Sequence, residues 1–435
     1  MGEKINSFWK KRYLLIILLG CSLLYSSKKY NTRNNSENSW HYIVSMDGRG
    51  YYAYLPAIFI YNDPTYSFYP EKNPLKENHI NFTHEIEGEK RINKFFCGEA
   101  VLLFPFFTAA HLFTKFSKYD SDGYSKPYYV SVGVAAVFYV SLGLWFLHLL
   151  ILSLTKNRLV SIITPLIILF GSNLYYYAIY EPSMSHVYSF FLVSIFLFYF
   201  NKVKYTLKIN SLIIVGLILG LITIVRPVNL VIIAIVPFFY NNRKELFEYA
   251  LNKKTLVRLA VSLISFVFVI LIQLYIYKWQ TEEWFYWSYK EEGFNFSNPQ
   301  IFNTLFSYQR GFFIYCPICF FALFGFVILF KKSIHRSFWL LATIFLSIYV
   351  VSCWHEWRYG WAYGLRAYIE FLPLYAILIA FILNIQNKYA LILLCFISIL
   401  CVLYTQIQTA QIVKGIIPLA GASEELFWEV FLKMK

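Results

Sequence analysis

The run SLIIVGLILGLITIVRPVNLVIIAIVPFFY (residues 211–240) is apolar along its whole length except near its middle, where Arg226 and Pro227 interrupt it. A continuous helix of this length would extend about 45 Å, whereas the hydrocarbon core of a bilayer is about 30 Å thick. It would also hold Arg226 near the midplane, at a cost of about 2.5–3.5 kcal/mol. We therefore predict that the chain breaks at Arg226–Pro227 and that this run crosses a membrane twice.

The composition indicates an integral membrane protein. Hydrophobic residues make up 58% of the chain and charged residues only 14%, against about 25% charged residues in soluble domains. The net charge of +15 comes from short Lys and Arg clusters between apolar runs, which is typical of cytoplasmic loops that face anionic lipid. We therefore expect membrane lipid as a partner and no nucleic acid. Cys316 and Cys319 lie inside an apolar run, and we expect them to be buried rather than redox-active or zinc-bound.

The apolar runs predict an all-α, polytopic membrane protein of about 11 transmembrane helices, with residues 1–435 forming a single domain. The first run follows Lys10, Lys11 and Arg12 and lacks a small-x-small cleavage site, so we read it as a retained signal anchor with a cytoplasmic amino terminus. Besides the double crossing of 211–240, the predicted spans are 13–27, 127–154, 159–179, 184–200, 259–277, 312–330, 338–353, 371–386 and 389–406.

Two topologies agree with the strongest loop charges. The basic loops at 243–258 and 331–336 must be cytoplasmic, which requires either that 95–116 spans and 211–240 crosses once, or that 95–116 does not span and 211–240 crosses twice. We prefer the second arrangement because of the helix length argued above; whether 95–116 spans or is interfacial stays open. The preferred arrangement places Lys156, Arg158, Lys202, Lys204 and Lys208 inside, and Lys115, Lys118, Lys126 and Arg226 outside.

The segments outside the cytoplasm then hold most of the polar chemistry. They are a long first loop (28–126), three further loops (180–186, 278–311 and 354–370), the break itself and the tail 407–435. The stretch WHEWRYGWAYGLR (354–366) combines aromatic rings, glycines and two arginines. An aromatic belt at the headgroups explains scattered Trp and Tyr, but this density suits a cavity that stacks on sugar faces and binds phosphate through guanidinium forks.

The order of several motifs resembles the GT-C superfamily of membrane glycosyltransferases. An acid, Asp47, follows the first span in SMDGRGYYAYLPAIFIYND (45–63), and interfacial helices and a many-spanning bundle come after it. The layout is most similar to bacterial relatives of the protein O-mannosyltransferases and of the lipid A aminoarabinose transferase, over about residues 10–375. The motifs that carry the resemblance are MDGRGYYAYLP, GEAVLLFPFFTAAHLF, DGYSKPYY, YEPSMSH, GLITIVRPVN and GWAYGLRAYIEFLP.

The resemblance implies transfer of a sugar from a polyprenyl-phosphate-linked donor to a glycan, lipid or protein acceptor on the outer face of the bacterial cytoplasmic membrane, without a cofactor. It implies that Asp47 is the catalytic base and that Glu181 occupies the place of a second acid. Members with two adjacent acids have a clear signature at the first site, whereas Gly48 follows Asp47 here. Asp47 could therefore be the base, position the acceptor, or serve only a turn.

The leaving phosphate needs cations, and the sequence offers several candidates for binding it or the sugar. His355–Glu356 does not form an HExxH motif, so we expect no metal. A transporter or flippase for a lipid-linked saccharide, or an O-antigen polymerase or ligase, are the alternative functions. The predicted binding residues are Arg366, Arg358, Arg226, Arg310, His186, His355 and Glu356.

Overall fold

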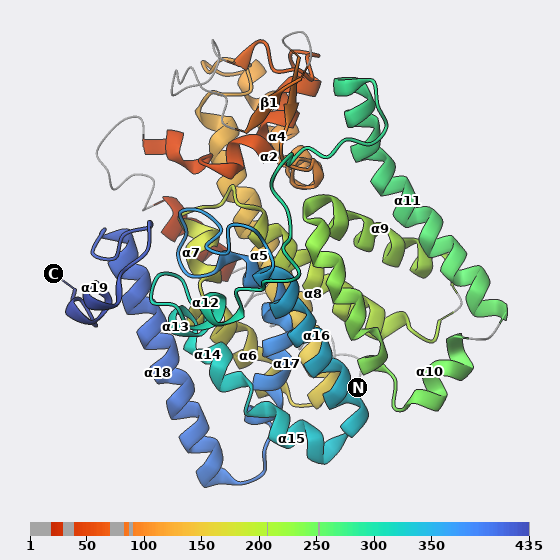
Figure 1. The fold of residues 1–435 in the computed structure, drawn as a ribbon, viewed down its shortest axis with the longest axis vertical. Coiled ribbons are helices and arrows are strands. Elements are labelled where there is room, and N and C mark those ends of the chain that lie inside the picture. Colours follow the sequence, from red (N-terminus) through yellow and green to blue (C-terminus); the bar gives the residue numbers. More distant parts are fainter. Residues whose placement is uncertain are drawn as a thin grey trace. The chain divides into compact units, whose positions relative to one another are not determined.

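A computed structural model describes residues 19–28, 39–69, 82–86, 90–206, 208–250 and 253–434 (Figure 1). The chain divides into two compact units. The first unit comprises Met1–Trp145, Tyr177–Tyr188 and Leu271–Tyr289; the second comprises Phe146–Tyr176, Ser189–Ile270 and Lys290–Lys435.

The first unit contains most of the long first loop. Residues 19–28 are helical, as predicted for the run 13–27, whose residues 13–18 lie outside the described chain. The loop holds η1 (Ser39–Ile43), α2 (Asp47–Phe59) and α4 (Gly98–Lys115), and it leads into α5 (Lys126–Thr155). The helix expected directly after Asp47 is α2, which packs against α4 (Figure 1). An antiparallel ladder of β1 (Thr83–Glu85) and β2 (Arg91–Asn93) was not predicted, because three-residue strands leave no usable alternation.

The break at Arg226 is confirmed. Helix α9 (Ile209–Val225) ends where Arg226 adopts an extended conformation, and η3 (Pro227–Phe239) begins at the proline. Pro227 has no backbone N–H and so cannot continue the hydrogen bonds of α9. The two helices pack against each other, and η3 also packs along α16 (Ile334–Ser352).

Two other predicted runs are less regular than expected. The run 159–179 divides into α6 (Arg158–Gly171) and α7 (Leu174–Ile179), whereas the run 371–386 forms α17 (Leu372–Leu383), which directly follows η4 (Arg366–Phe371). Proline explains the second interruption, because α14 begins at Pro317 and so separates α13 from it. This run, 312–330, consists of α13 (Phe312–Tyr315), α14 (Pro317–Ala322) and α15 (Gly325–Lys332).

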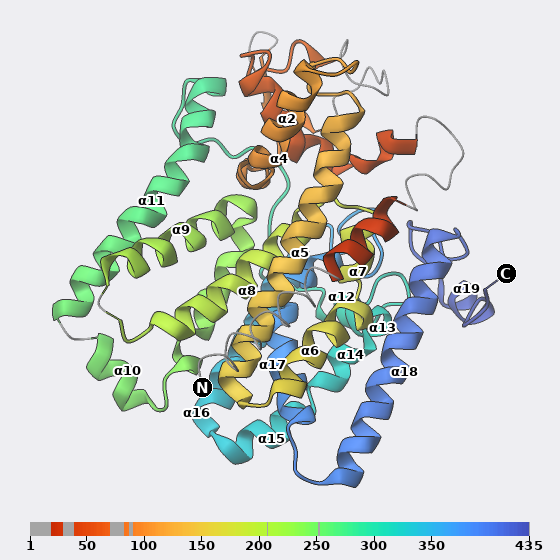
Figure 2. The same ribbon diagram turned by 180° about the vertical axis from the view of Figure 1, so that it is seen from behind.

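The remaining helices are α8 (Ser185–Val203), α10 (Arg243–Ala250), α11 (Lys253–Thr281), α12 (Ile301–Phe306), α18 (Lys388–Val413) and α19 (Glu424–Glu429). Figure 2 shows α6 beside α18, against which it packs. Cys316 and Cys319 are fully buried, as predicted.

Six helical segments of the described chain are long and apolar enough to cross a membrane. They are α5, α8, most of α11, α16, Arg366–Leu383 and α18, and three shorter apolar helices accompany them: α6, α9 and η3. The chain is therefore an all-α, multi-pass membrane protein; the count of eleven spans stays a prediction.

Small residues let α9 approach α11 closely. A Cβ on Gly216 would lie 2.1 Å from the Ser262 carbonyl oxygen, and one on Gly220 would lie 2.6 Å from Val269 Cβ. Glycines four residues apart on one helix face are a common means of helix association in membranes. The Ser262 hydroxyl adds an interhelical hydrogen bond by donating to the Leu212 carbonyl oxygen at 2.9 Å.

The preferred topology can be tested with two exposed lysines, Lys118 and Lys208. In a variant without the seven native cysteines, Lys118→Cys should react with an impermeant thiol reagent added outside intact cells, because the preferred topology places the segment after α4 outside. Lys208→Cys should react only after permeabilisation. The reverse pattern would mean that α4 spans the membrane and that 211–240 crosses it once.

Candidate functional site

The start of α2 and the loop 180–184 are held in close contact within the first unit. A Cβ on Gly48 would lie 2.0 Å from Ser183 Oγ, so only glycine fits. The Ser45 amide also donates to Ser183 Oγ, at 3.3 Å. Close packing therefore explains why residue 48 is a glycine. The same contact holds together the two segments that carry the predicted acids Asp47 and Glu181.

Backbone strain occurs directly before Asp47. Met46 has φ of 48°, in the left-handed region that non-glycine residues rarely adopt. Such a conformation costs on the order of 1–3 kcal/mol, and it persists only where the surrounding structure enforces it, frequently at functional sites. Asp47 is the first residue of α2 and is partly buried. A carboxylate at this position is favoured by the helix dipole.

Buried polar contacts fix α2 to the rest of the first loop. The Tyr52 hydroxyl donates to the Gly123 carbonyl oxygen, and the Tyr54 hydroxyl donates to that of Phe95, both at 2.5 Å. The Asn93 side chain donates to the Gly50 carbonyl oxygen at 2.8 Å. The tyrosines that follow Asp47 in the sequence therefore position the helix that carries it.

Glu99 is an acid that the sequence analysis did not assign to the site. It lies in the first turn of α4, is completely buried, and has no hydrogen-bond partner for either carboxylate oxygen within the described part of the chain. Burial raises the pKa of Glu99 well above its usual value, and the charge of Asp47 raises it further. Both effects disfavour the ionised form. The signal in the sequence was an acid within an otherwise apolar run.

Glu181 and His186 also belong to the first unit, and both are buried. The His186 ring lies edge-on to Tyr177, with the centroids 5.7 Å apart. The Tyr188 hydroxyl donates to the carbonyl oxygen of Pro182, the residue after Glu181, at 2.9 Å. Asp47, Glu99, Glu181 and His186 all lie in the first unit, and we call these four residues the acid group.

The predicted cations lie in the second unit, where Arg226 is paired. Its Nε lies 3.2 Å from Glu370 Oε1, and its guanidinium lies over the Tyr359 ring at 5.9 Å from the centroid. Glu370 is completely buried, and the sequence analysis missed it because it is the last residue of a predicted loop, directly before a predicted span. Tyr359 has φ of 57°, a second strained residue beside a candidate group.

Arg366 is nearly buried in η4, four residues before Glu370. A Cβ on Gly360 would lie 3.8 Å from Arg366 Nη2, so the turn after Tyr359 passes close to this guanidinium. Arg226, Arg366, Glu370 and Tyr359 therefore form a compact group, which we call the arginine group.

Arg310 and Arg358 make different contacts. Arg310 is 1% exposed and donates to the carbonyl oxygens of Arg358, at 3.3 Å, and Leu419, at 2.7 Å. Arg358 is exposed, and its Nε donates to Gln309 Oε1 at 2.9 Å. Its backbone N–H donates to Glu356 Oε1 at 3.1 Å, and His355 beside it is exposed. These contacts fasten loops together and do not join the arginine group.

Comparisons with known proteins give a structural likeness and no match in sequence. No family model matches the chain, and no curated protein matches it. Among solved structures, the chain is similar to the oligosaccharyltransferase of Archaeoglobus fulgidus in its apo form, with 12% sequence identity and a TM-score of 0.49. The similarity covers 98% of this chain and 60% of that one. A likeness of this size carries no inference about activity.

The protonation of Glu99 can be tested through stability. Because its pKa is higher in the folded chain than in the unfolded chain, the folded protein keeps a proton that the unfolded chain releases. The free energy of unfolding then decreases as pH rises above the ordinary carboxyl range, by up to about 1.4 kcal/mol per pH unit. Gln cannot ionise, so the melting temperature of Glu99→Gln relative to the parent should increase between about pH 5 and about pH 8.

The matched control is Glu283→Gln, which alters an exposed carboxyl of the same unit and should leave the parental pH dependence unchanged. A Glu99→Gln difference that stays constant with pH would show that Glu99 is ionised in the folded chain.

Proposed function

We propose that this chain is a GT-C-type membrane glycosyltransferase. It transfers a sugar from a polyprenyl-phosphate-linked donor to an acceptor hydroxyl or amine at the outer face of the bacterial cytoplasmic membrane. The observation that carries the proposal is the acid group of the first unit, in which a strained turn at Met46 and the close contact of Gly48 with Ser183 fix the start of the helix that carries Asp47.

The acid group offers two carboxyls in different environments. Glu99 is completely buried, and this burial raises its pKa, whereas Asp47 is partly exposed. Environments that separate two carboxyls in this way assign different roles to them. We assign Asp47 as the base that takes the proton from the acceptor nucleophile, and Glu99 as a neutral residue beside it.

The reaction is a single displacement. The acceptor oxygen or nitrogen bonds to the anomeric carbon while the bond from that carbon to the phosphate oxygen breaks. Asp47 receives the acceptor proton, and the polyprenyl phosphate leaves with the bonding electron pair. One base is sufficient, unlike the paired acids of glycoside hydrolysis. Charge on the leaving phosphate is stabilised by guanidinium groups rather than by a proton.

In the proposal, the arginine group supplies the positive charge that stabilises the leaving phosphate. Glu370 lies against Arg226, so its carboxylate orients Arg226 and offsets part of its charge. Arg366, whose planar fork matches two phosphate oxygens, is then the residue that we assign to the donor phosphate. Glu181 and His186 belong with the acid group and are assigned to the acceptor.

One feature also fits a transporter. The break between α9 and η3 places Arg226 at the end of an interrupted helix, and interrupted helices are typical of transporter binding sites. A transporter would move a labelled polyprenyl-phosphate sugar across vesicle membranes without consuming it, whereas a transferase releases free polyprenyl phosphate.

Asp47→Asn preserves the shape of the side chain and the start of α2 but removes the proton acceptor. We expect transfer of labelled sugar to fall by about 10²–10⁴-fold, with donor binding and melting temperature nearly unchanged. If more than about a tenth of the rate remains, well short of that loss, the base is another acid, and Glu181 and Glu356 are the next to be tested.

Asp63→Asn is the matched control in the same unit. Asp63 Oδ1 accepts from both the amide and the hydroxyl of Thr65, and Oδ2 accepts from those of Ser67. This variant should lower the melting temperature while the transfer rate of the folded fraction stays at the parental value.

Arg366→Lys keeps the charge and removes the bidentate fork. Donor affinity should fall by about tenfold to a hundredfold, the effect of losing one hydrogen bond to a charged group, as measured by binding of a labelled polyprenyl-phosphate sugar. Arg358→Lys is the control, because Arg358 is exposed and contacts Gln309. A loss seen only with Arg358→Lys would move the phosphate site to Arg358.

A further inference from the structure

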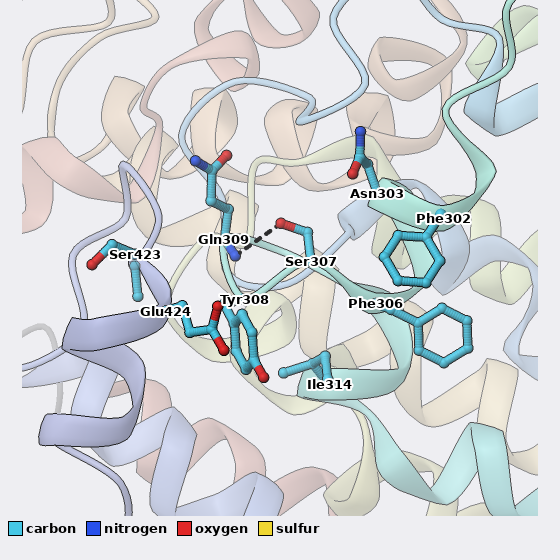
Figure 3. Close-up of a pocket in the computed structure, with 10 residues that line it drawn as sticks. Phe302, Asn303, Phe306, Ser307, Tyr308, Gln309, Ile314, Ser423 and Glu424 are labelled. Atoms are coloured by element: carbon cyan, nitrogen blue, oxygen red, sulfur yellow. Dashed lines mark hydrogen bonds between the residues drawn. The ribbon is translucent and has the colours of Figure 1, made fainter.

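A cavity of about 580 Å³ lies in the second unit, between the segment around α12 and the segment before α19 (Figure 3). This volume is within the range of about 300–1,000 Å³ that small-molecule sites occupy. The arginine group and the acid group contribute no residue to it. Its lining consists of Phe302, Asn303, Phe306, Ser307, Tyr308, Gln309, Ile314, Ala422, Ser423 and Glu424.

The walls of this cavity are fixed by contacts on both sides. The Tyr308 ring packs against Phe427, with the centroids 5.1 Å apart, and the Tyr308 carbonyl oxygen accepts from the Tyr315 hydroxyl at 2.7 Å. The C-terminal wall is held at Leu419, whose carbonyl oxygen accepts from Arg310 and, at 3.2 Å, from the Ala362 amide. Arg310, predicted to bind phosphate, thus holds the wall of a different site.

Two amide side chains of the lining, Gln309 and Asn303, each have one of their two polar atoms hydrogen-bonded to another residue of the protein. Gln309 Oε1 accepts from Arg358 Nε at 2.9 Å, which leaves its Nε2 as the donor that it can offer to the cavity. Asn303 Nδ2 donates to Gln300 Oε1 at 2.9 Å, which leaves its Oδ1 as an acceptor. Glu424, in the first turn of α19, adds a carboxylate.

The chemistry of the lining selects one class of ligand. Three aromatic rings offer faces to C–H groups, while the amides, hydroxyls and carboxylate hydrogen-bond to hydroxyls. No Lys, Arg or His is among the lining residues given above. A phosphate or another anion would therefore meet the Glu424 carboxylate without a compensating cation. A neutral, polyhydroxylated ligand suits both the aromatic and the polar side chains of the lining.

We propose that this cavity is a saccharide subsite that binds a sugar ring of a neutral glycan. Phe302, Phe306 and Tyr308 contact the ring faces, and Gln309, Asn303 and Glu424 bind its hydroxyls. The role as an acceptor subsite rests on the proposed transferase function, in which the segments 278–311 and 407–435 both lie outside the cytoplasm. Saccharide binding itself does not depend on transfer.

The test uses the full chain in lipid nanodiscs and three neutral probes: maltotriose, chitotriose and mannotriose. Binding is measured without donor, by saturation-transfer NMR and by the fluorescence of Trp428, whose ring lies 6.0 Å from that of Tyr308. At least one trisaccharide should bind to the parent. Glu424→Gln should weaken binding about tenfold or more, since it removes a hydrogen bond to a charged group. Phe302→Ala should also weaken binding, and its 73% exposed side chain makes misfolding a minor concern.

Glu425→Gln is the matched control. It removes the same charge from the same first turn of α19, but Glu425 does not line the cavity. It should bind the trisaccharide like the parent. Equal binding by the Glu424→Gln and Glu425→Gln proteins would overturn the proposal, as would the absence of binding by all three probes. Binding of phosphocholine in place of the trisaccharides would identify the cavity as a lipid headgroup site and would also overturn it.

Asp47→Asn separates this proposal from the transfer reaction. The variant should bind the trisaccharide as the parent does, because Asp47 does not line the cavity. Trisaccharide binding without any sugar transfer by the parent would contradict the proposed function and leave the subsite in place. Transfer by a parent that binds no saccharide would contradict the subsite alone.

Discussion

The need to satisfy every backbone polar group in a water-free environment governs this fold. An unsatisfied N–H or C=O group in hydrocarbon costs several kcal/mol, so helices can break only where other groups replace the lost hydrogen bonds. The end of α6 shows how this is done. Gln406 donates to the Phe170 carbonyl oxygen at 2.6 Å, and Thr405 donates to that of Gly171 at 3.2 Å. Asn173, just beyond, donates to the Tyr363 carbonyl oxygen at 3.1 Å. Thr405 and Gln406 of α18 therefore bind carbonyl oxygens that have no partner within α6 because the helix ends there.

The same constraint explains where the candidate groups lie. Each is built at an end or an interruption of a helix: Asp47 at the start of α2, Arg226 between α9 and η3, and Arg366 at the start of η4. The acid group and the arginine group each also have a non-glycine residue with positive φ. These residues are Met46, next to Asp47, and Tyr359, whose ring lies under the Arg226 guanidinium. The supporting contacts differ, however. Tyrosine hydroxyls bound to backbone carbonyls hold the acid group, whereas an ion pair inside an apolar scaffold holds the arginine group.

The sequence predicted what hydrophobic length and helix-breaking residues determine. The long apolar helices and the break at Arg226–Pro227 follow from apolar run length and from proline, whereas the helix after Asp47 was expected from the resemblance. Glu99 and Glu370 escaped prediction because an acid within an apolar run looks the same whether it is a site residue or a residue at a span end. Their burial and partners depend on helices distant in sequence. Arg310 and Arg358 were assigned by residue type alone, which cannot show that the Arg310 guanidinium donates to backbone carbonyls and that of Arg358 to a glutamine side chain. The cavity beside α12 was not predicted, since it joins segments more than a hundred residues apart.

The pairing of Arg226 with Glu370 sets an order for the assembly of the second unit. Glu370 is synthesised only after α10, α11 and the helices α12 to α16. At roughly 5–20 residues per second, the arginine precedes its carboxylate by on the order of ten seconds. During that interval the carboxylate that pairs with Arg226 does not yet exist, so α9 and η3 are synthesised before the ion pair that joins Arg226 to η4 can form.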